Sequence, residues 1–219
     1  MKNIFSYDSK LSQVLGFIAD LFIINVVFLI CCIPIVTIGA AQAGLYSAMR
    51  VAQDMKDGRS VIKVFFEGFR DGFGTITLNS TLFLVLDAVA AYTVLMAYSY
   101  RETGLFIHWA IPAVILVLSL LLHSLLPAFH SRFGCRPVEL IRNCALLLFT
   151  HPVRSVAVAV LTWLPAGMFL LAPKLWLQLG ALFITVYYSV AVLFCELLMR
   201  RPFKLLTDSM KTENAAEAG

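Results

Sequence analysis

The sequence predicts an all-α protein, a polytopic membrane helical bundle of six transmembrane helices in three hairpins, with two short amphipathic helices on the inner face. Of its 219 residues, 60% are hydrophobic and only 14% are charged, and the mean hydropathy is +0.87. Soluble domains carry about 25% charged residues. Apolar runs recur almost to the end, and basic residues fall between them. We therefore expect a single integral membrane domain over residues 1–219, without a soluble module.

The first two crossings are predicted from one apolar run over residues 11–51, which is too long for a single span. About 20 mainly apolar residues cross a bilayer, so residues 13–33 suffice. Pro34 lacks an N–H and its ring collides with the preceding turn, so a helix tends to end there. We expect a hairpin with a second helix over residues 35–51. The alternative is one long helix and an interfacial segment, giving five crossings. A cleaved signal peptide is disfavoured, because its apolar core would be only about 7–15 residues long.

Small residues predict where helices pack closely. Ala40, Gly44 and Ala48 recur every fourth position of the second helix and share one face. Such faces let helix backbones approach each other inside a bilayer. Gly16 shares a face of the first helix with Asp20, which predicts a close helix contact beside that acid. The predicted helix-packing residues are Gly16, Pro34, Ala40, Gly44 and Ala48.

The remaining elements follow from the spacing of apolar residues. The further spans are expected at residues 75–97, 105–126, 153–171 and 175–199, and the amphipathic helices at residues 61–73 and 137–149. The first amphipathic helix either lies on the membrane surface or packs on the protein's own inner face, and both interpretations stay open. We expect a polar, frayed tail after residue 200.

The basic residues predict the orientation. With six crossings, the outer loops keep only Arg101 and Lys174, and all other basic residues lie on one side. The positive-inside bias then places both termini in the cytoplasm. Five crossings would move Lys2 and Lys10 outside, which weakens the asymmetry. Because orientation accounts for the basic residues, we expect no nucleic-acid partner.

Acidic and amide side chains within the apolar runs are the candidate binding residues. A carboxylate in mid-membrane costs about 2.5–3.5 kcal/mol on insertion scales, so it usually faces the bundle interior and finds a partner. Such acids either bind a proton or solute, or hold helices together by hydrogen bonds. For Glu196 we expect an i,i+4 pair with Arg200. The candidate intramembrane polar or binding residues are Asp20, Asn25, Asn79, Asp87 and Glu196.

No catalytic, cofactor or metal motif stands out. The five cysteines form no CxxC pair, and the histidines lack ligand spacing. HExxH, GxSxG and phosphate-binding glycine loops are absent. Nothing in the sequence points to Ser/His/Asp chemistry. We therefore expect no cofactor, no metal, no disulfide and no enzyme activity.

The N-terminal residues resemble the YesL-type family of small bacterial membrane proteins of unknown function. The resemblance rests on Asp8-Ser9, Ala19-Asp20-Leu21, Asn25, residues 32–40 (CIPIVTIGA) and Phe65-Phe66-Glu-Gly-Phe69. Genes of that family tend to lie beside components of carbohydrate ABC transporters. The resemblance therefore implies a bacterial cytoplasmic-membrane protein linked to sugar uptake, and it supplies no catalytic residues.

Three hypotheses of function follow. The first is an accessory protein for ABC-type carbohydrate uptake or utilisation, with the lipid bilayer and transporter subunits as partners. The second is a small-solute transporter or channel that uses the intramembrane acids Asp20 and Asp87. The third, an intramembrane enzyme, needs an acid–base pair in a wet cleft, and the sequence offers only unpaired candidates. The resemblance favours the first hypothesis, and the oligomeric state stays open.

Overall fold

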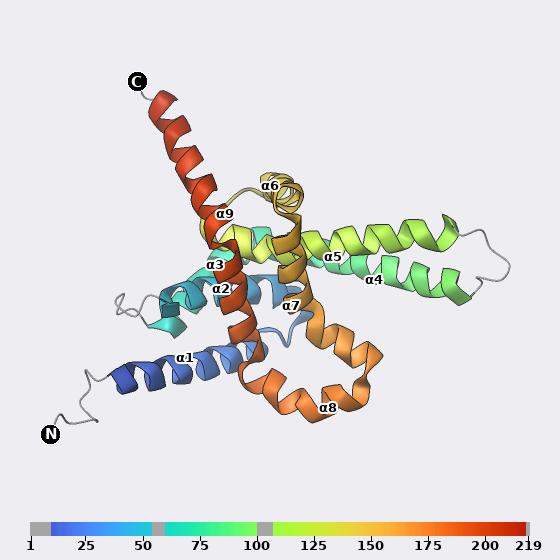
Figure 1. Cartoon of the computed structure of the whole chain (residues 1–219), viewed down its shortest axis with the longest axis horizontal. Coiled ribbons are helices and arrows are strands. Elements are labelled where there is room, and N and C mark those ends of the chain that lie inside the picture. Colours follow the sequence, from blue (N-terminus) through green and yellow to red (C-terminus); the bar gives the residue numbers. More distant parts are fainter. Residues whose placement is uncertain (1–9, 54–59, 100–106, 218–219) are drawn as a thin grey trace.

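A computed structural model describes residues 10–53, 60–99 and 107–217, with side chains over residues 14–53, 60–99 and 108–208. Every regular element in these ranges is a helix (Figure 1). The predicted polar lead before residue 10, the turn around residue 58 and the connection around residue 102 lie outside the described residues. The helices are α1 (Lys10–Cys31), η1 (Ile35–Thr37), α2 (Ile38–Gln53), α3 (Val61–Gly72), α4 (Thr75–Ser99), α5 (Ile107–Phe133), α6 (Pro137–Thr150), α7 (Pro152–Leu171), α8 (Pro173–Leu182), η2 (Phe183–Tyr187) and α9 (Tyr188–Glu217).

Five helical segments of the described chain are long and apolar enough to cross a membrane. They are Val14–Cys31, Thr75–Ser99, His108–Phe133, Pro152–Leu171 and Pro173–Asp208. These lengths and compositions confirm the all-helical class and indicate a multi-pass membrane protein. The arrangement of six crossings as three hairpins stays a prediction.

Whether the chain crosses the membrane five or six times depends on α2. Its 16 residues make a helix about 24 Å long, shorter than a hydrocarbon core of roughly 30 Å. Instead of facing lipid, α2 lies among α1, α3, α4, α5 and α9 (Figure 1). Ala40, Leu45 and Met49 have no exposed surface. This helix is therefore the centre of the core, and it begins at Ile38 rather than at residue 35.

The turn between α1 and α2 forms around Pro34. The backbone of Pro34 is extended, with φ −76° and ψ 117°, so the first helix cannot continue through it. The Thr37 hydroxyl lies 2.6 Å from the Cys31 carbonyl oxygen and 2.7 Å from that of Pro34. It can thereby donate to the Cys31 carbonyl, which the end of α1 leaves without a helical partner, and to the Pro34 carbonyl within the turn itself. This capping fixes the direction in which the chain returns.

Close packing joins α2 to α3 and α4. A Cβ atom on Gly44 would lie 2.7 Å from the Phe65 carbonyl oxygen of α3, and one on Gly39 would lie 2.8 Å from Ser80 Oγ of α4. Ala40 and Ala48, on the predicted small-residue face, are fully buried. The face of α3 that carries Val64 and Phe65 therefore packs on the protein itself, while the apolar side chains of Ile62, Phe66 and Phe73 are exposed.

Two predicted helix ends are wrong. We expected a span to end at residue 126, but α5 continues through Pro127 to Phe133. Proline removes one helical hydrogen bond, and the buried neighbours Leu126 and Ala128 hold the helix in place. We also expected a frayed tail, but α9 extends to Glu217. Phe203 is fully buried against Phe129 and Phe133, and this packing stabilises the helix beyond the end of the apolar run.

Gly44→Ala is expected to destabilise the protein, by about 1–3 kcal/mol, because the new methyl group would collide with the backbone of α3. The matched control is Gly16→Ala. The structure shows no atom within 4 Å of a Cβ there, so the close contact expected at Gly16 is absent. This control should leave stability unchanged or slightly raised. Denaturant unfolding in detergent micelles measures both, and equal effects would contradict the α2–α3 packing.

Candidate functional site

A serine, a histidine and an aspartate form a hydrogen-bonded chain between α4 and α5. Asp87 Oδ2 lies 2.9 Å from His123 Nδ1, and His123 Nε2 lies 2.9 Å from Ser80 Oγ. All three side chains are buried. A neutral imidazole that carries its proton on Nδ1 donates to the carboxylate, and Nε2 then accepts the serine proton. The arrangement has the order of a nucleophile, a base and a group that orients the base.

The helix period explains why these residues meet. Ser80 and Asp87 are two turns apart on α4, so they share one face and stand about 10.5 Å apart along the axis. His123 enters from α5, which packs along α4 (Figure 1). The rings of Phe83 and Trp163 flank the imidazole, with centroids 6.1 and 5.2 Å away. The ring therefore has little freedom to turn away from either partner.

Ser80 and His123 both line a cavity of about 200 Å³. Asp87 does not line it and lies behind the imidazole ring. The cavity is bounded by α1, α2, α4, α5, α7 and α9, and most of its other walls are apolar or aromatic. Gln42 of α2 also lines it, and the buried Gln42 Oε1 has no hydrogen-bond partner. A carbonyl-bearing ligand here would meet both a hydroxyl and a carboxamide.

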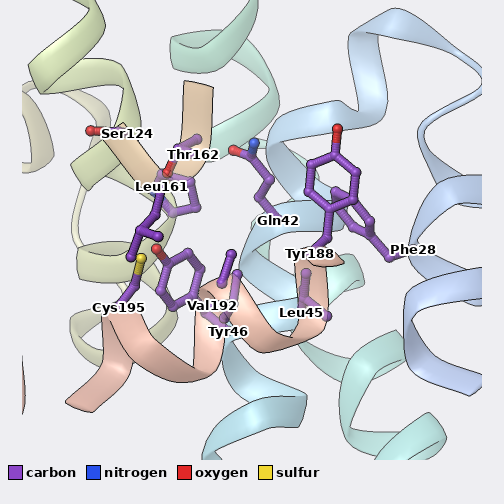
Figure 2. A pocket seen from close by; sticks show the side chains of 12 residues that line it. Phe28, Gln42, Leu45, Tyr46, Ser124, Leu161, Thr162, Tyr188, Val192 and Cys195 are labelled. Carbon is purple, nitrogen blue, oxygen red and sulfur yellow. The ribbon is translucent and has the colours of Figure 1, made fainter. Parts of the chain in front are cut away.

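An adjoining crevice shows how Gln42 is placed. It has a volume of about 20 Å³, enough for about one water molecule. Figure 2 shows the Gln42 carboxamide extending from α2 toward Thr162 of α7, with Tyr188 and Phe28 on its other side. Gln42, Phe28, Thr162 and Tyr188 line both spaces. The carboxamide therefore stands between the crevice and the larger cavity.

A second polar cluster surrounds Glu196, which is 2% exposed. Arg132 of α5 donates to Glu196 Oε2, and Arg50 Nη2 of α2 lies 3.8 Å from Oε1. Arg50 also donates to the carbonyl and hydroxyl oxygens of Ser131, at 2.9 and 2.8 Å. The expected i,i+4 pair with Arg200 is wrong, because no ion pair joins these two described side chains. Glu196 instead holds α2, α5 and α9 together.

Asn25 satisfies backbone groups at a π-helical turn. Its Nδ2 donates to the Ile184 carbonyl oxygen at 2.6 Å, and its Oδ1 accepts from the Ser189 N–H at 3.1 Å. The Ile184 carbonyl lies within η2 and the Ser189 N–H follows it, where the wider helical turn disturbs the i→i−4 pattern. A buried backbone group without a partner is costly in lipid. Asn25 therefore fixes α1 against the start of α9.

The two remaining candidates differ in exposure. Asn79 is buried, and its Nδ2 donates to the Pro137 carbonyl oxygen at 3.2 Å, which joins α4 to α6. Asp20 is half-buried on α1, and among the described residues it has no hydrogen-bond or ion-pair partner. Of the residues three and four positions further along the helix, Ile23 is 41% exposed and Ile24 is fully buried. Asp20 thus lies at the edge between the exposed and the buried face of α1.

A larger groove of about 620 Å³ lies between α5, α6 and α9. Cys135 and Asn143 line it. Burial raises the pKa of the Cys135 thiol, while a hydrogen bond with Asn143 opposes that shift. Burial also raises the pKa of Cys144 on α6 far above its usual range. These thiols stay protonated at neutral pH and are poor nucleophiles.

The structure distributes the predicted polar residues over separate sites. Asp20 and Asp87 lie on different helices, and neither lines the cavity beside Ser80. Sequence reasoning missed Ser80, and it assigned no role to His123. The signal available was the seven-residue spacing of Ser80 and Asp87 on one helical face. The partner helix that supplies His123 could not be identified from that spacing.

Residues 21–96 match the model of a family described as a protein of unknown function, DUF624. The YesL family is the DUF624 family. The resemblance of the N-terminal residues is thereby confirmed. The DUF624 segment includes Asn25, Ser80 and Asp87, while His123 and Glu196 lie outside it. No curated protein and no solved structure matches the chain.

Removing the Glu196 carboxylate is expected to be destabilising. Glu196→Ala leaves the partly exposed guanidinium groups of Arg50 and Arg132 without their buried anion, which costs about 1–3 kcal/mol. The control is Arg200→Ala, because Arg200 is exposed on the same helix. That change should stay within about 0.5 kcal/mol. Unfolding free energies in detergent compare the two, and a larger effect of Arg200→Ala would restore the i,i+4 interpretation.

Proposed function

We propose that this protein is an accessory component of carbohydrate uptake in the bacterial cytoplasmic membrane, where it contacts subunits of an ABC-type sugar transporter. The link to sugar is what the DUF624 (YesL) resemblance implies. The contact itself is supported by Asp20, an acid at the exposed edge of α1 without a partner among the described residues. This role depends on association, and it requires no chemical step by this chain.

Asp20 is the observation that carries the proposal. A carboxyl group in a membrane-spanning helix costs about 2.5–3.5 kcal/mol unless a polar group meets it. The other candidate polar residues all have partners within the chain, at Asn25, Asn79, Asp87 and Glu196. Asp20 has none in the described structure, and it lies beside the exposed side chain of Ile23 on the same helix. A polar group from another membrane protein would offset the cost.

The alternative is a small-solute transporter or channel. That function would need Asp20 and Asp87 along one polar path. Asp87 is instead hydrogen-bonded to His123 in the interior, and Asp20 lies on another helix. This separation favours the accessory role. Unchanged solute uptake in cells that carry both Asp20→Asn and Asp87→Asn would count further against transport.

Co-purification tests the accessory role. The tagged wild-type chain, extracted in mild detergent, is expected to recover the membrane subunits of a sugar ABC transporter. Asp20→Leu should lower that recovery at least fivefold, because it removes the carboxyl group that the partner would meet. The melting temperature of the isolated Asp20→Leu protein should not fall, since no described residue pairs with Asp20.

The matched control is Ile23→Leu, a conservative change at an exposed position of the same helix. It should leave recovery of the transporter subunits unchanged. Failure of the wild-type chain to recover any transporter subunit would contradict the accessory role. Equal recovery by wild type and Asp20→Leu would show that Asp20 is not the contact.

From the distribution of the basic residues we further propose that both termini are cytoplasmic, which requires the short helix α2 to serve as a sixth crossing. A reporter that is active only outside the cytoplasm, fused to residue 1, should then be silent. The same reporter inserted after residue 101 should be active, because that connection is external with either five or six crossings. Activity at residue 1 would mean that α2 does not cross and that the crossings number five.

A further inference from the structure

We propose that Ser80, His123 and Asp87 form a nucleophilic triad that cleaves a carboxylic ester of an apolar chain taken from the bilayer. Ser80 is the nucleophile, His123 the general base, and Asp87 the positioning residue. This activity goes beyond the accessory role and does not depend on it. It also opposes the expectation from the sequence that the chain is not an enzyme.

The geometry meets the requirements of an activated serine. A nucleophile must lie within hydrogen-bond reach of its base, and the base must be oriented by a third group. Both contacts measure 2.9 Å and join opposite nitrogen atoms of one imidazole. Only the nucleophile and the base reach the cavity, while the carboxylate stands behind the ring. A substrate in the cavity would therefore meet the reacting groups first.

Several hydroxyl groups on the described helices behave differently from Ser80. Serine and threonine in a helix usually donate to a carbonyl three or four residues earlier. Ser124 donates to the Leu121 carbonyl at 2.8 Å, and Thr162 donates to that of Val158 at 2.9 Å. Ser80 instead meets His123. Its hydroxyl proton is thus directed to a base and not to the helix backbone.

The cavity walls indicate the class of substrate. Phe28, Leu29 and Leu84 are among the apolar residues that line it, so it suits an apolar chain. Ile35 also lines it and is 65% exposed, which connects the cavity to the surface at the turn between α1 and α2. Gln42 Nε2 is the donor that can hydrogen-bond a carbonyl oxygen, because Gln42 Oε1 is itself an acceptor. An acyl ester that enters from the membrane matches both features.

The reaction balances without a cofactor. Ser80 Oγ attacks the ester carbon while its proton passes to His123 Nε2. The C–O bond to the alcohol then breaks, and the imidazolium gives that proton to the leaving alcohol. Water attacks the acyl-serine, His123 accepts its proton and returns it to Ser80, and the carboxylic acid is released. The overall reaction consumes one ester and one water molecule.

A fluorophosphonate probe with an alkyl chain tests the proposal on the full-length protein in nanodiscs. Wild type is expected to form a covalent adduct, which peptide mass spectrometry should locate at Ser80. Ser80→Ala should abolish the adduct, and Ser124→Ala should retain it. Asp87→Asn should slow labelling at least tenfold, and His123→Gln at least a hundredfold. Wild type should also release acid from a medium-chain nitrophenyl ester, and Ser80→Ala should not.

Gel filtration and melting temperatures establish that each variant folds, and Ser80→Ala removes only one oxygen atom. Absence of an adduct in wild type with excess probe, in both nanodiscs and detergent, would overturn the triad. So would an adduct at another residue, or one that persists in Ser80→Ala. Labelling that depends on Ser80 and proceeds at the wild-type rate in Asp87→Asn would overturn the positioning role of Asp87.

Discussion

The close approach of α2 to its neighbours is the constraint on which the rest of this structure depends. Lipid tails are as apolar as leucine, so helices in a membrane associate mainly by van der Waals contact and hydrogen bonds. Gly44 lets the Phe65 carbonyl of α3 approach, and Gly39 does the same for Ser80 of α4. With larger residues at these positions, α4 would move outward and the polar groups between the helices would separate.

Hydrogen bonds between polar side chains then fix helices that are far apart in the sequence. Asn25 joins α1 to the turn before α9, and Glu196 joins α2, α5 and α9. In a dry interior an unpaired polar group costs more than it does in water. These residues therefore specify one arrangement of the helices, which apolar packing alone would leave less defined.

The accessory role and the proposed ester cleavage use different surfaces of the molecule. Asp20 lies at the exposed edge of α1, while Ser80 faces a cavity that begins at the turn after α1. Because the two sites share no residue, a partner bound at Asp20 need not cover the cavity.

The sequence by itself determined the class of protein and the positions of most helices. Apolar length predicts the spans, because it is a local property of the chain. The period of α3 predicts a helix but not its buried face, since Ile62, Phe66 and Phe73 are exposed and Val64 and Phe65 are buried. The small residues Ala40, Gly44 and Ala48 indicated where packing is close. The resemblance to a family of unknown function was also evident from short N-terminal motifs.

Only the tertiary structure decided which polar groups meet. Glu196 was expected to pair with Arg200, four residues away, and it pairs with arginines on two other helices. Ser80 and Asp87 form a hydrogen-bonded chain only because α5 brings His123 between them. Such contacts depend on the relative rotation and depth of separate helices. That rotation is set by the sum of many packing contacts, and no local pattern in the sequence records it.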